Sequence, residues 1–322
     1  MTAGAALFAA ACVFAVVYGA NAGSALLSMG LVTSTVPPWA SVILVAAAVA
    51  GAPLLLGTAV AGTVSRELVT LDGDPGRWLL LAAVVCTIAV VTVLSWLGLP
   101  TSMTLALLSG LAGVGIGSGT QVAWGRFGEV FAGLALAPVL GAVTTALMLA
   151  MMRPWSSRGS MQMLAGRVHV FAFLGLVIAF GANDGQKILA VMVVAAGPAT
   201  GPVALSWLHL LAAGVLFALG AALGLKRMAG SVNRGVLSVR PDSAATTELA
   251  TAAVMIGGST VGAPVGMSQV LTGALVGIGM SSGRRRIRWE FVARLVMAWV
   301  VTVPTTLLTG MAAGLVVGAL AA

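Results

Sequence analysis

The chain has 322 residues, of which 60% are hydrophobic and 7% are charged, and its formal net charge is +8. A soluble globular domain carries about 25% charged residues because water must cover its surface. This composition therefore excludes a soluble protein and predicts an all-α integral membrane protein. The 42 glycines agree with that prediction, since small residues let membrane helices approach closely.

Apolar runs long enough to cross a bilayer recur about ten times along the chain. Polar residues interrupt the first and the sixth of them, which we therefore expect to be broken helices. The fourth and the ninth are Gly-rich, and the sequence leaves open whether they cross the membrane or turn back as re-entrant hairpins. In chain order, the predicted spans are 3–30, 39–61, 78–98, 101–119, 129–152, 167–196, 203–225, 244–262, 264–282 and 289–320.

The basic residues between the spans predict an orientation. If the N-terminus lies outside the cytoplasm, basic residues gather in the inside loops, as is typical of cytoplasmic loops. We therefore expect a multi-pass protein of the plasma (inner) membrane with both termini extracytoplasmic, in contact with anionic lipids and not with nucleic acid. The inside set is Arg153, Arg158, Arg167, Lys226, Arg227, Arg234, Arg240, Arg284, Arg285, Arg286, Arg288 and Arg294, and the outside set is Arg66, Arg77 and Arg126.

Three sequence matches, in the same order and at nearly constant separation, indicate an internal repeat. With about five spans per copy, an odd number, the second copy enters the membrane from the opposite side. Inverted repeats are typical of secondary transporters, which bind substrate near the middle of the membrane. The matches pair 19–21 with 181–183, 61–66 with 229–234 and 100–104 with 264–268. We expect a first repeat at 1–152, a cytoplasmic linker at 153–166 and a second repeat at 167–322.

The segment 181–187, Gly-Ala-Asn-Asp-Gly-Gln-Lys, lies inside the sixth span. An ionised Asp184 at the centre of a bilayer costs at least about 2.5–3.5 kcal/mol unless it is paired or hydrated. The glycines allow the backbone to open and to line a cavity. We therefore expect Asn183 and Asp184 to bind substrate, and Asp184 also to bind a cation or a proton. The alternative is that Asp184 pairs with Lys187 at i, i+3 and only packs.

Further candidates are neutral. The first copy of the motif supplies Asn21 and Ser24 but has Ala22 where the second has Asp184. The prolines that open the segments after positions 100 and 264 predict helix N-termini, whose free amides attract anions. Neutral donors suit an anion that must be released again. The donors expected there are Thr101, Ser102, Thr104, Ser268 and Gln269, with ordinary helix–helix contacts as the alternative for each.

Glu248, at the start of the eighth span, is a second candidate carboxylate. It would act as a cation ligand or a proton relay, with an interfacial position as the alternative. We expect His209 to pack within its span and His169 to lie near a span end. The sequence holds no HExxH or GxSxG arrangement, so we predict no enzyme, no catalytic residue, no resident metal and no cofactor.

Taken together, the paired Gly-Ala-Asn motifs and the Pro-x-Ser-x-Thr-type segments resemble the inorganic phosphate transporter (PiT) family of secondary carriers. The resemblance spans almost the whole chain and is that of a bacterial member with a degenerate first motif. It implies import of phosphate with a coupled cation, sodium or a proton, by alternating access, often as a homodimer. By position, Asn21, Asn183 and Asp184 match the family's broken-helix motifs, and Glu248 resembles a family glutamate ahead of the second hairpin.

The sequence also departs from the family pattern. Ala22 removes one of two paired aspartates, which argues against a two-sodium mechanism, and Leu105 and Gln269 replace the family histidine. Fewer acidic acceptors would suit a fully deprotonated anion such as sulfate, whereas a protonated phosphate can donate a hydrogen bond to Asp184. A sulfate or other oxyanion carrier is therefore the main alternative, followed by a channel, a sensor and a membrane-embedded enzyme.

Overall fold

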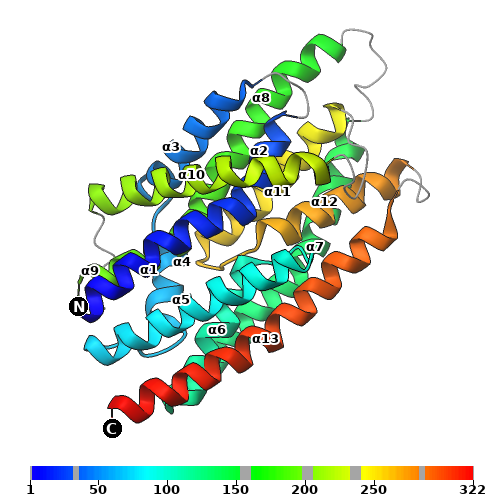
Figure 1. The fold of residues 1–322 in the computed structure, drawn as a ribbon. Coiled ribbons are helices and arrows are strands. Elements are labelled where there is room, and N and C mark those ends of the chain that lie inside the picture. The colour runs from blue at the N-terminus through cyan, green and yellow to red at the C-terminus, as the bar shows by residue number, and fades with distance from the viewer. Residues whose placement is uncertain are drawn as a thin grey trace.

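The computed structural model describes residues 2–31, 36–152, 161–197, 206–232, 241–282 and 287–321, and these are almost entirely helical (Figure 1). The helices are α1 (Ala3–Tyr18), α2 (Ser24–Leu31), α3 (Pro38–Leu56), α4 (Ala59–Gly62), α5 (Gly73–Trp96), α6 (Met103–Ser118), α7 (Trp124–Met152), α8 (Met161–Phe180), α9 (Gln186–Ala196), α10 (Trp207–Val232), α11 (Pro241–Thr260), α12 (Met267–Ser282) and α13 (Trp289–Ala321). One-turn π-helices are η1 (Gly19–Gly23), η2 (Thr63–Glu67) and η4 (Gly181–Gly185).

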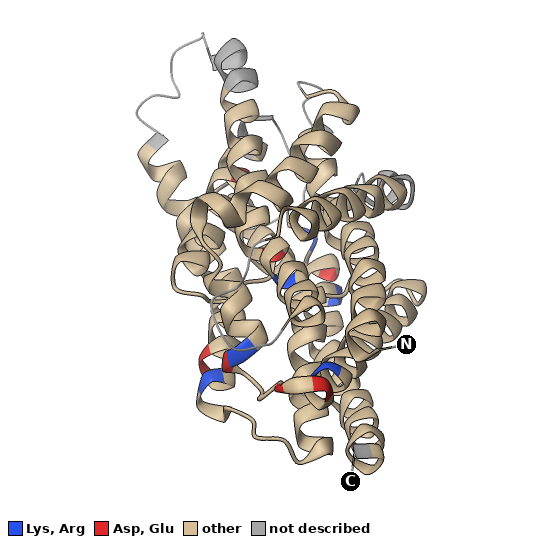
Figure 2. Ribbon diagram, turned by 90° about the vertical axis from the view of Figure 1, so that its left-hand side faces the viewer, with Lys and Arg blue, Asp and Glu red and all other residues tan. Residues whose placement is uncertain are grey.

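Nine of the ten predicted spans coincide with one helix or with two helices joined by a π turn, and the span 39–61 covers α3 and α4, which Gly57 and Thr58 join. The all-α membrane fold is therefore confirmed. Within the described residues, seven helical stretches are long and apolar enough to cross a membrane. The shorter apolar helices α6 and α12, of 16 residues each, correspond to the Gly-rich segments. Few charged residues interrupt the ribbon in Figure 2, and side chains such as Val143, Leu211 and Val300 are exposed, as a lipid-facing surface requires.

Two expectations differ in detail from the structure. Helix α8 begins at Met161, inside the segment expected to be a linker, and residues 153–160 lie outside the described chain. The polar interruptions at η1 and η4 remain helical, as single π turns, rather than opening into loops. Such turns insert one extra residue into an α-helix and are frequent at functional sites. Among the inside basic residues, Arg153, Arg158, Arg234, Arg240, Arg284, Arg285 and Arg286 lie outside the described chain.

The helix contacts follow the internal repeat. The turn η1 packs against α10, and its counterpart η4 packs against α3, the counterpart of α10. In the same way, α6 packs against α13, and α12 packs against α7. Each half therefore places its last helix on a hairpin of the other half, as two interlocked inverted repeats require. The N- and C-termini lie at the same end of the molecule, in agreement with an even number of crossings (Figure 1).

Glycines allow these helices to touch backbone to backbone. A Cβ at Gly113 of α6 would overlap with the Leu307 carbonyl of α13, and a Cβ at Gly273 of α12 would overlap with the Pro138 carbonyl of α7. Small residues at such crossings replace the hydrophobic driving force that is absent between helices in lipid. The contacts fix the position of α6 and α12, whose N-termini face the interior.

Two helical hairpins carry the proline segments. Residues 97–102 join α5 to α6, and residues 261–266 join α11 to α12. The Ser102 hydroxyl caps α6 by accepting the Leu105 N–H at 3.4 Å. Gly262 takes a φ of +69°, a left-handed conformation that lets the chain turn directly after α11. The α11–α12 connection lies in the middle of the molecule (Figure 1), which is where a buried binding site is expected.

Candidate functional site

The two asparagines of the π turns hold the two hairpin connections. The Asn183 Oδ1 accepts the Val265 N–H at 2.9 Å, and its Nδ2 donates to the Ala263 carbonyl at 3.0 Å. In the first half, the Asn21 Nδ2 donates to the Thr101 Oγ1 at 3.2 Å. Because Pro100 matches Pro264 in the repeat, Thr101 is the counterpart of Val265. Each asparagine therefore anchors the equivalent position of its own half's hairpin.

Asp184 is the centre of a buried hydrogen-bond network that joins the two halves. Its Oδ1 lies 2.6 Å from the Lys187 Nζ, accepts the Tyr18 hydroxyl at 2.5 Å and lies 3.4 Å from the Thr104 Oγ1. All four side chains are buried. Tyr18 and Thr104 come from the first half, whereas Asp184 and Lys187 come from the second, so this network spans the interface between the repeats.

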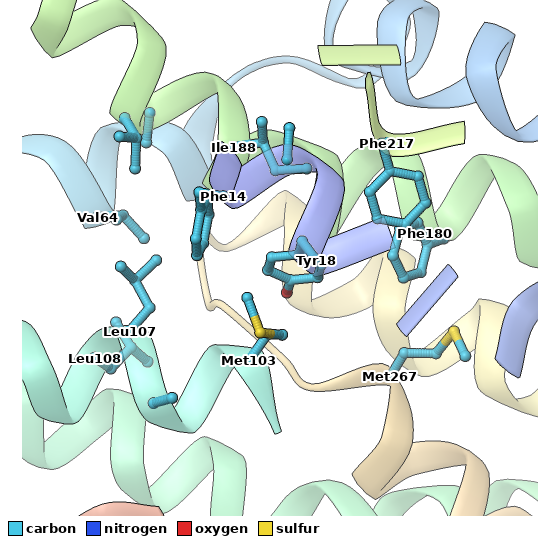
Figure 3. Packing of buried hydrophobic residues seen from close by; sticks show 14 of the residues in the cluster. Phe14, Tyr18, Val64, Met103, Leu107, Leu108, Phe180, Ile188, Phe217 and Met267 are labelled. Carbon is cyan, nitrogen blue, oxygen red and sulfur yellow. The ribbon is translucent and has the colours of Figure 1, made fainter. Parts of the chain in front are cut away.

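The Tyr18 ring rests in an aromatic cluster next to the network. It meets Phe14 edge-on, with 5.4 Å between ring centroids, and Phe217 at 6.1 Å. Figure 3 shows these rings together with Phe180, and the Tyr18 hydroxyl on the side of the first residue of α6, Met103. The rings exclude water and strengthen the polar contacts beside them. Tyr18 is the chain's one tyrosine and directly precedes the first motif, a signal that sequence reasoning missed.

The Lys187 ammonium group uses all of its donors inside the network. Its Nζ lies 2.6 Å from the Asp184 Oδ1, 2.8 Å from the Thr104 Oγ1 and 2.7 Å from the Val265 carbonyl oxygen. Three N–H groups thus meet three acceptors, and the side chain is fully buried. The ion pair that the sequence offered as an alternative does form.

Two buried oxygens at this place have no hydrogen-bond partner in the described part of the chain: Asp184 Oδ2 and Gln269 Oε1. Leaving such a group unpaired costs about 1–3 kcal/mol, so it marks a place where a ligand or water binds. Gly266 brings the Gln269 side chain close to the tip of the other hairpin. A Cβ added at Gly266 would lie 2.5 Å from the Gln269 Oε1 and 3.3 Å from the Ser102 Oγ.

Not every predicted site residue joins this centre. The Ser24 hydroxyl donates to the Ala20 carbonyl of its own helix at 2.8 Å. Ser268 is half-buried in the first turn of α12, and its hydroxyl makes no hydrogen bond with the described residues. The predicted residues that the structure brings to the π turns and hairpin tips are Asn21, Thr101, Ser102, Thr104, Asn183, Asp184 and Gln269.

Glu248 forms a separate buried pair. Its Oε2 lies 3.0 Å from the His169 Nδ1, and both side chains are fully buried between α8 and α11. The expectation that His169 lies near a span end missed this partner, since only the packing of α8 on α11 brings the two residues together. A carboxylate and an imidazole in contact can bind or release a proton, so the net charge of this pair can change within the membrane. No hydrogen bond between described residues links this pair to Asp184.

A pocket of about 340 Å³ opens beside the turn after α11. It is lined by Thr260 and Gly262 from that turn and by Arg66 and Arg126 from the opposite half. Arg126 is held there by an ion pair with Glu67 at 2.9 Å. The pocket therefore presents basic side chains close to one end of the hairpin that Asn183 anchors.

Asn183 and Asn21 make different numbers of contacts, which gives a matched pair of substitutions. We expect Asn183→Ala to lower the free energy of unfolding by about 1–3 kcal/mol, because the buried Val265 N–H and Ala263 carbonyl lose their partner. Asn21→Ala removes one half-buried bond and should cost less. Thermal unfolding in detergent measures both variants, and equal losses of stability would contradict the anchoring role of Asn183.

The two repeats and the fold both have known relatives. The model of the family described as "Phosphate transporter family" matches residues 18–174 and again residues 156–310, one match for each repeat. A probable low-affinity inorganic phosphate transporter of Mycobacterium tuberculosis (strain H37Rv) is 30% identical over 277 residues, which cover 79% of this chain. A protein of the same description from Bacillus subtilis is 23% identical over 265 residues, covering 79% of each chain.

A solved structure, "The sodium-dependent phosphate transporter", superposes with a TM-score of 0.82 at 16% identity, covering 98% of this chain and 99% of that one. This likeness confirms the fold. The matched region is 63% of the length of the M. tuberculosis relative, so the chain spans about that share of it.

Proposed function

Because this chain belongs to the phosphate transporter family, we propose that it imports inorganic phosphate together with a coupled cation, sodium or a proton, by alternating access. The observation that carries the proposal is the convergence of two hairpin tips and two π turns on one buried centre. There the Asp184 Oδ2 and the Gln269 Oε1 have no partner among the described residues. Substrates of inverted-repeat carriers bind at such a centre.

The N-termini of α6 and α12 suit an anion. The first amides of each helix have no acceptor within the helix, and the helix dipole adds partial positive charge. Thr101 and Ser102 supply hydroxyl donors at one tip, and the Gln269 amide supplies a donor at the other. These groups are neutral, so they bind phosphate without holding it too tightly for release.

Asp184 favours phosphate over sulfate. Hydrogen phosphate carries an O–H that can donate to the unpaired Asp184 Oδ2, whereas sulfate at neutral pH has no O–H and offers that carboxylate only acceptor oxygens. Retention of a buried carboxylate beside the anion site thus supports a protonated oxyanion as the substrate.

The interlocked repeats support alternating access. The residues of the Asp184 network are buried. The contacts of Asp184 with Tyr18 and Thr104 join the second half of the chain to the first. Rocking one half against the other would exchange these contacts and open the centre to each side in turn. Asp184 and Glu248, the two buried carboxylates named above, are the candidate sites for coupled charge.

We further propose a plasma-membrane location with both termini extracytoplasmic and contact with anionic lipid. Cross-linking would test whether the protein forms a homodimer.

Uptake of radiolabelled phosphate into proteoliposomes tests the proposal. We expect an inward sodium or proton gradient to accelerate uptake, and unlabelled phosphate, but not sulfate, to suppress it. The gradient that drives uptake names the coupling ion. Uptake suppressed equally by sulfate would favour the oxyanion alternative, and uptake no faster than in protein-free liposomes under either gradient would contradict the proposed function.

A further inference from the structure

The position of the Lys187 ammonium group has the ligand set of a cation site. One carboxylate oxygen (Asp184), one hydroxyl oxygen (Thr104) and one main-chain carbonyl oxygen (Val265) lie between 2.6 and 2.8 Å from Nζ. Hard cations take oxygen ligands of these kinds, and in secondary transporters main-chain carbonyls at interrupted helices hold coupling sodium ions. Here a side chain of the protein itself occupies the position.

This position has no room for a second positive charge. The ammonium group donates each of its three protons to one of the three oxygens and has no acceptor capacity of its own. Two unit charges 4 Å apart repel by about 4 kcal/mol at an effective dielectric constant of 20, so a sodium ion does not bind next to Lys187 at the same oxygens.

The internal repeat shows that the two charges come as a unit. Matching Gly19 with Gly181 places Ala22 opposite Asp184 and Ala25 opposite Lys187. The first copy therefore lacks both the carboxylate and the ammonium group, although it keeps the asparagine that anchors its hairpin. If Asp184 bound an external cation, it would not need a lysine one turn away. The presence of Lys187 one turn away therefore indicates that the chain itself neutralises this carboxylate.

We propose that Lys187 is a resident cation, which fills the place of a metal ion at Asp184 and keeps external sodium out of this site. The inference rests on the proposed function only in treating Asp184 as part of the transport site. Of the two candidate sites for coupled charge, Asp184 is then balanced from within the chain, which leaves Glu248 as the candidate and places any driving sodium ion or proton away from Asp184. Lys187 thus restricts where a coupling ion can bind.

Removing the amine should create a site for a free cation. We expect the melting temperature of Lys187→Ala, measured in detergent without phosphate, to rise by several degrees and saturably when choline chloride is replaced by sodium chloride or methylammonium chloride at equal ionic strength. The wild type should show no sodium response that depends on Asp184. A double variant, Asp184→Asn with Lys187→Met, has no charge at this place and should show no response in either salt.

The melting experiments distinguish a vacated cation site from the absence of one. If Lys187→Ala folds only when sodium or methylammonium is present, that result also supports a vacated cation site. The inference is overturned if neither cation stabilises Lys187→Ala, or if sodium stabilises the wild type and the double variant loses that effect. Because melting requires no transport, a protein without phosphate uptake would refute the proposed function and leave this result unchanged.

Discussion

Replacing Asp184 by Asn is expected to lower the rate of phosphate uptake by about 10- to 100-fold. The carboxylate is the proposed acceptor for the phosphate O–H and the partner of Lys187, the Tyr18 hydroxyl and Thr104. A hydrogen bond to a charged group contributes about 1.5–3 kcal/mol, and its loss from the transport barrier corresponds to a tenfold change in rate for each 1.4 kcal/mol. Uptake by reconstituted protein, normalised to the amount of folded carrier, measures the loss.

A loss of uptake through misfolding must be separated from a loss of function. The Asp184→Asn variant leaves the Lys187 ammonium group buried without a counter-charge, which destabilises the fold. Changing Lys187 to Met as well removes the unpaired charge, so we expect the double variant to regain thermal stability but not uptake. An Asp184→Asn protein that folds and transports at the wild-type rate would refute the role of this carboxylate.

The second large effect concerns packing rather than chemistry. We expect Gly273→Val to prevent accumulation of folded protein, because a Cβ at Gly273 would overlap with the backbone of Pro138 in α7. Backbone cannot rotate away as a flexible side chain can. The cost should therefore exceed the 1–3 kcal/mol typical of overpacking with mobile side chains, and we expect at least about 3 kcal/mol.

Gly133, in the partner helix α7, is the control position. A Cβ added there meets no atom within 4 Å, so Gly133→Ala should keep the fold and gain up to about 1 kcal/mol from its better helix propensity. Size-exclusion chromatography of detergent-solubilised protein compares the two. A monodisperse Gly273→Val protein in wild-type amount would contradict the packing of α12 on α7.

The fold was largely predictable from the sequence because its causes are local. A run of about 20 apolar residues is enough to predict a span, and three matched segments are enough to predict the repeat. The hairpin tips were predictable for a similar reason, since proline and a following hydroxyl residue favour a helix start. The π turns at Gly19 and Gly181 were not predictable in form, because their helical geometry depends on packing against α10 and α3.

The site was predictable where a motif places a polar residue inside a span, as for Asn183 and Asp184. Sequence reasoning failed where the partner comes from elsewhere in the chain, as for Tyr18, which reaches Asp184 from the other repeat. It also failed for Ser24, whose hydroxyl bonds the backbone four residues earlier, a local option that any helical serine has. Glu248 was found by its charge alone, but its partner His169 required the tertiary structure.

The two repeats differ in the charged residues that they contribute to the central site. Asn21 and Asn183 both anchor a hairpin, whereas the Asp184–Lys187 ion pair of the second motif has Ala22 and Ala25 as its counterparts in the first. The molecule thus consists of two similar scaffolds around one charged centre.

Phosphate counterflow tests the central claim, that this chain carries phosphate by alternating access, most directly. Proteoliposomes are loaded with unlabelled phosphate and diluted into a trace of labelled phosphate, with the same sodium concentration and pH on both sides. We predict transient accumulation of label above its equilibrium level, because each carrier that releases unlabelled phosphate outside returns with a labelled one. Label that only equilibrates, at a rate that internal phosphate does not change, would indicate a channel or no transport and would contradict the account.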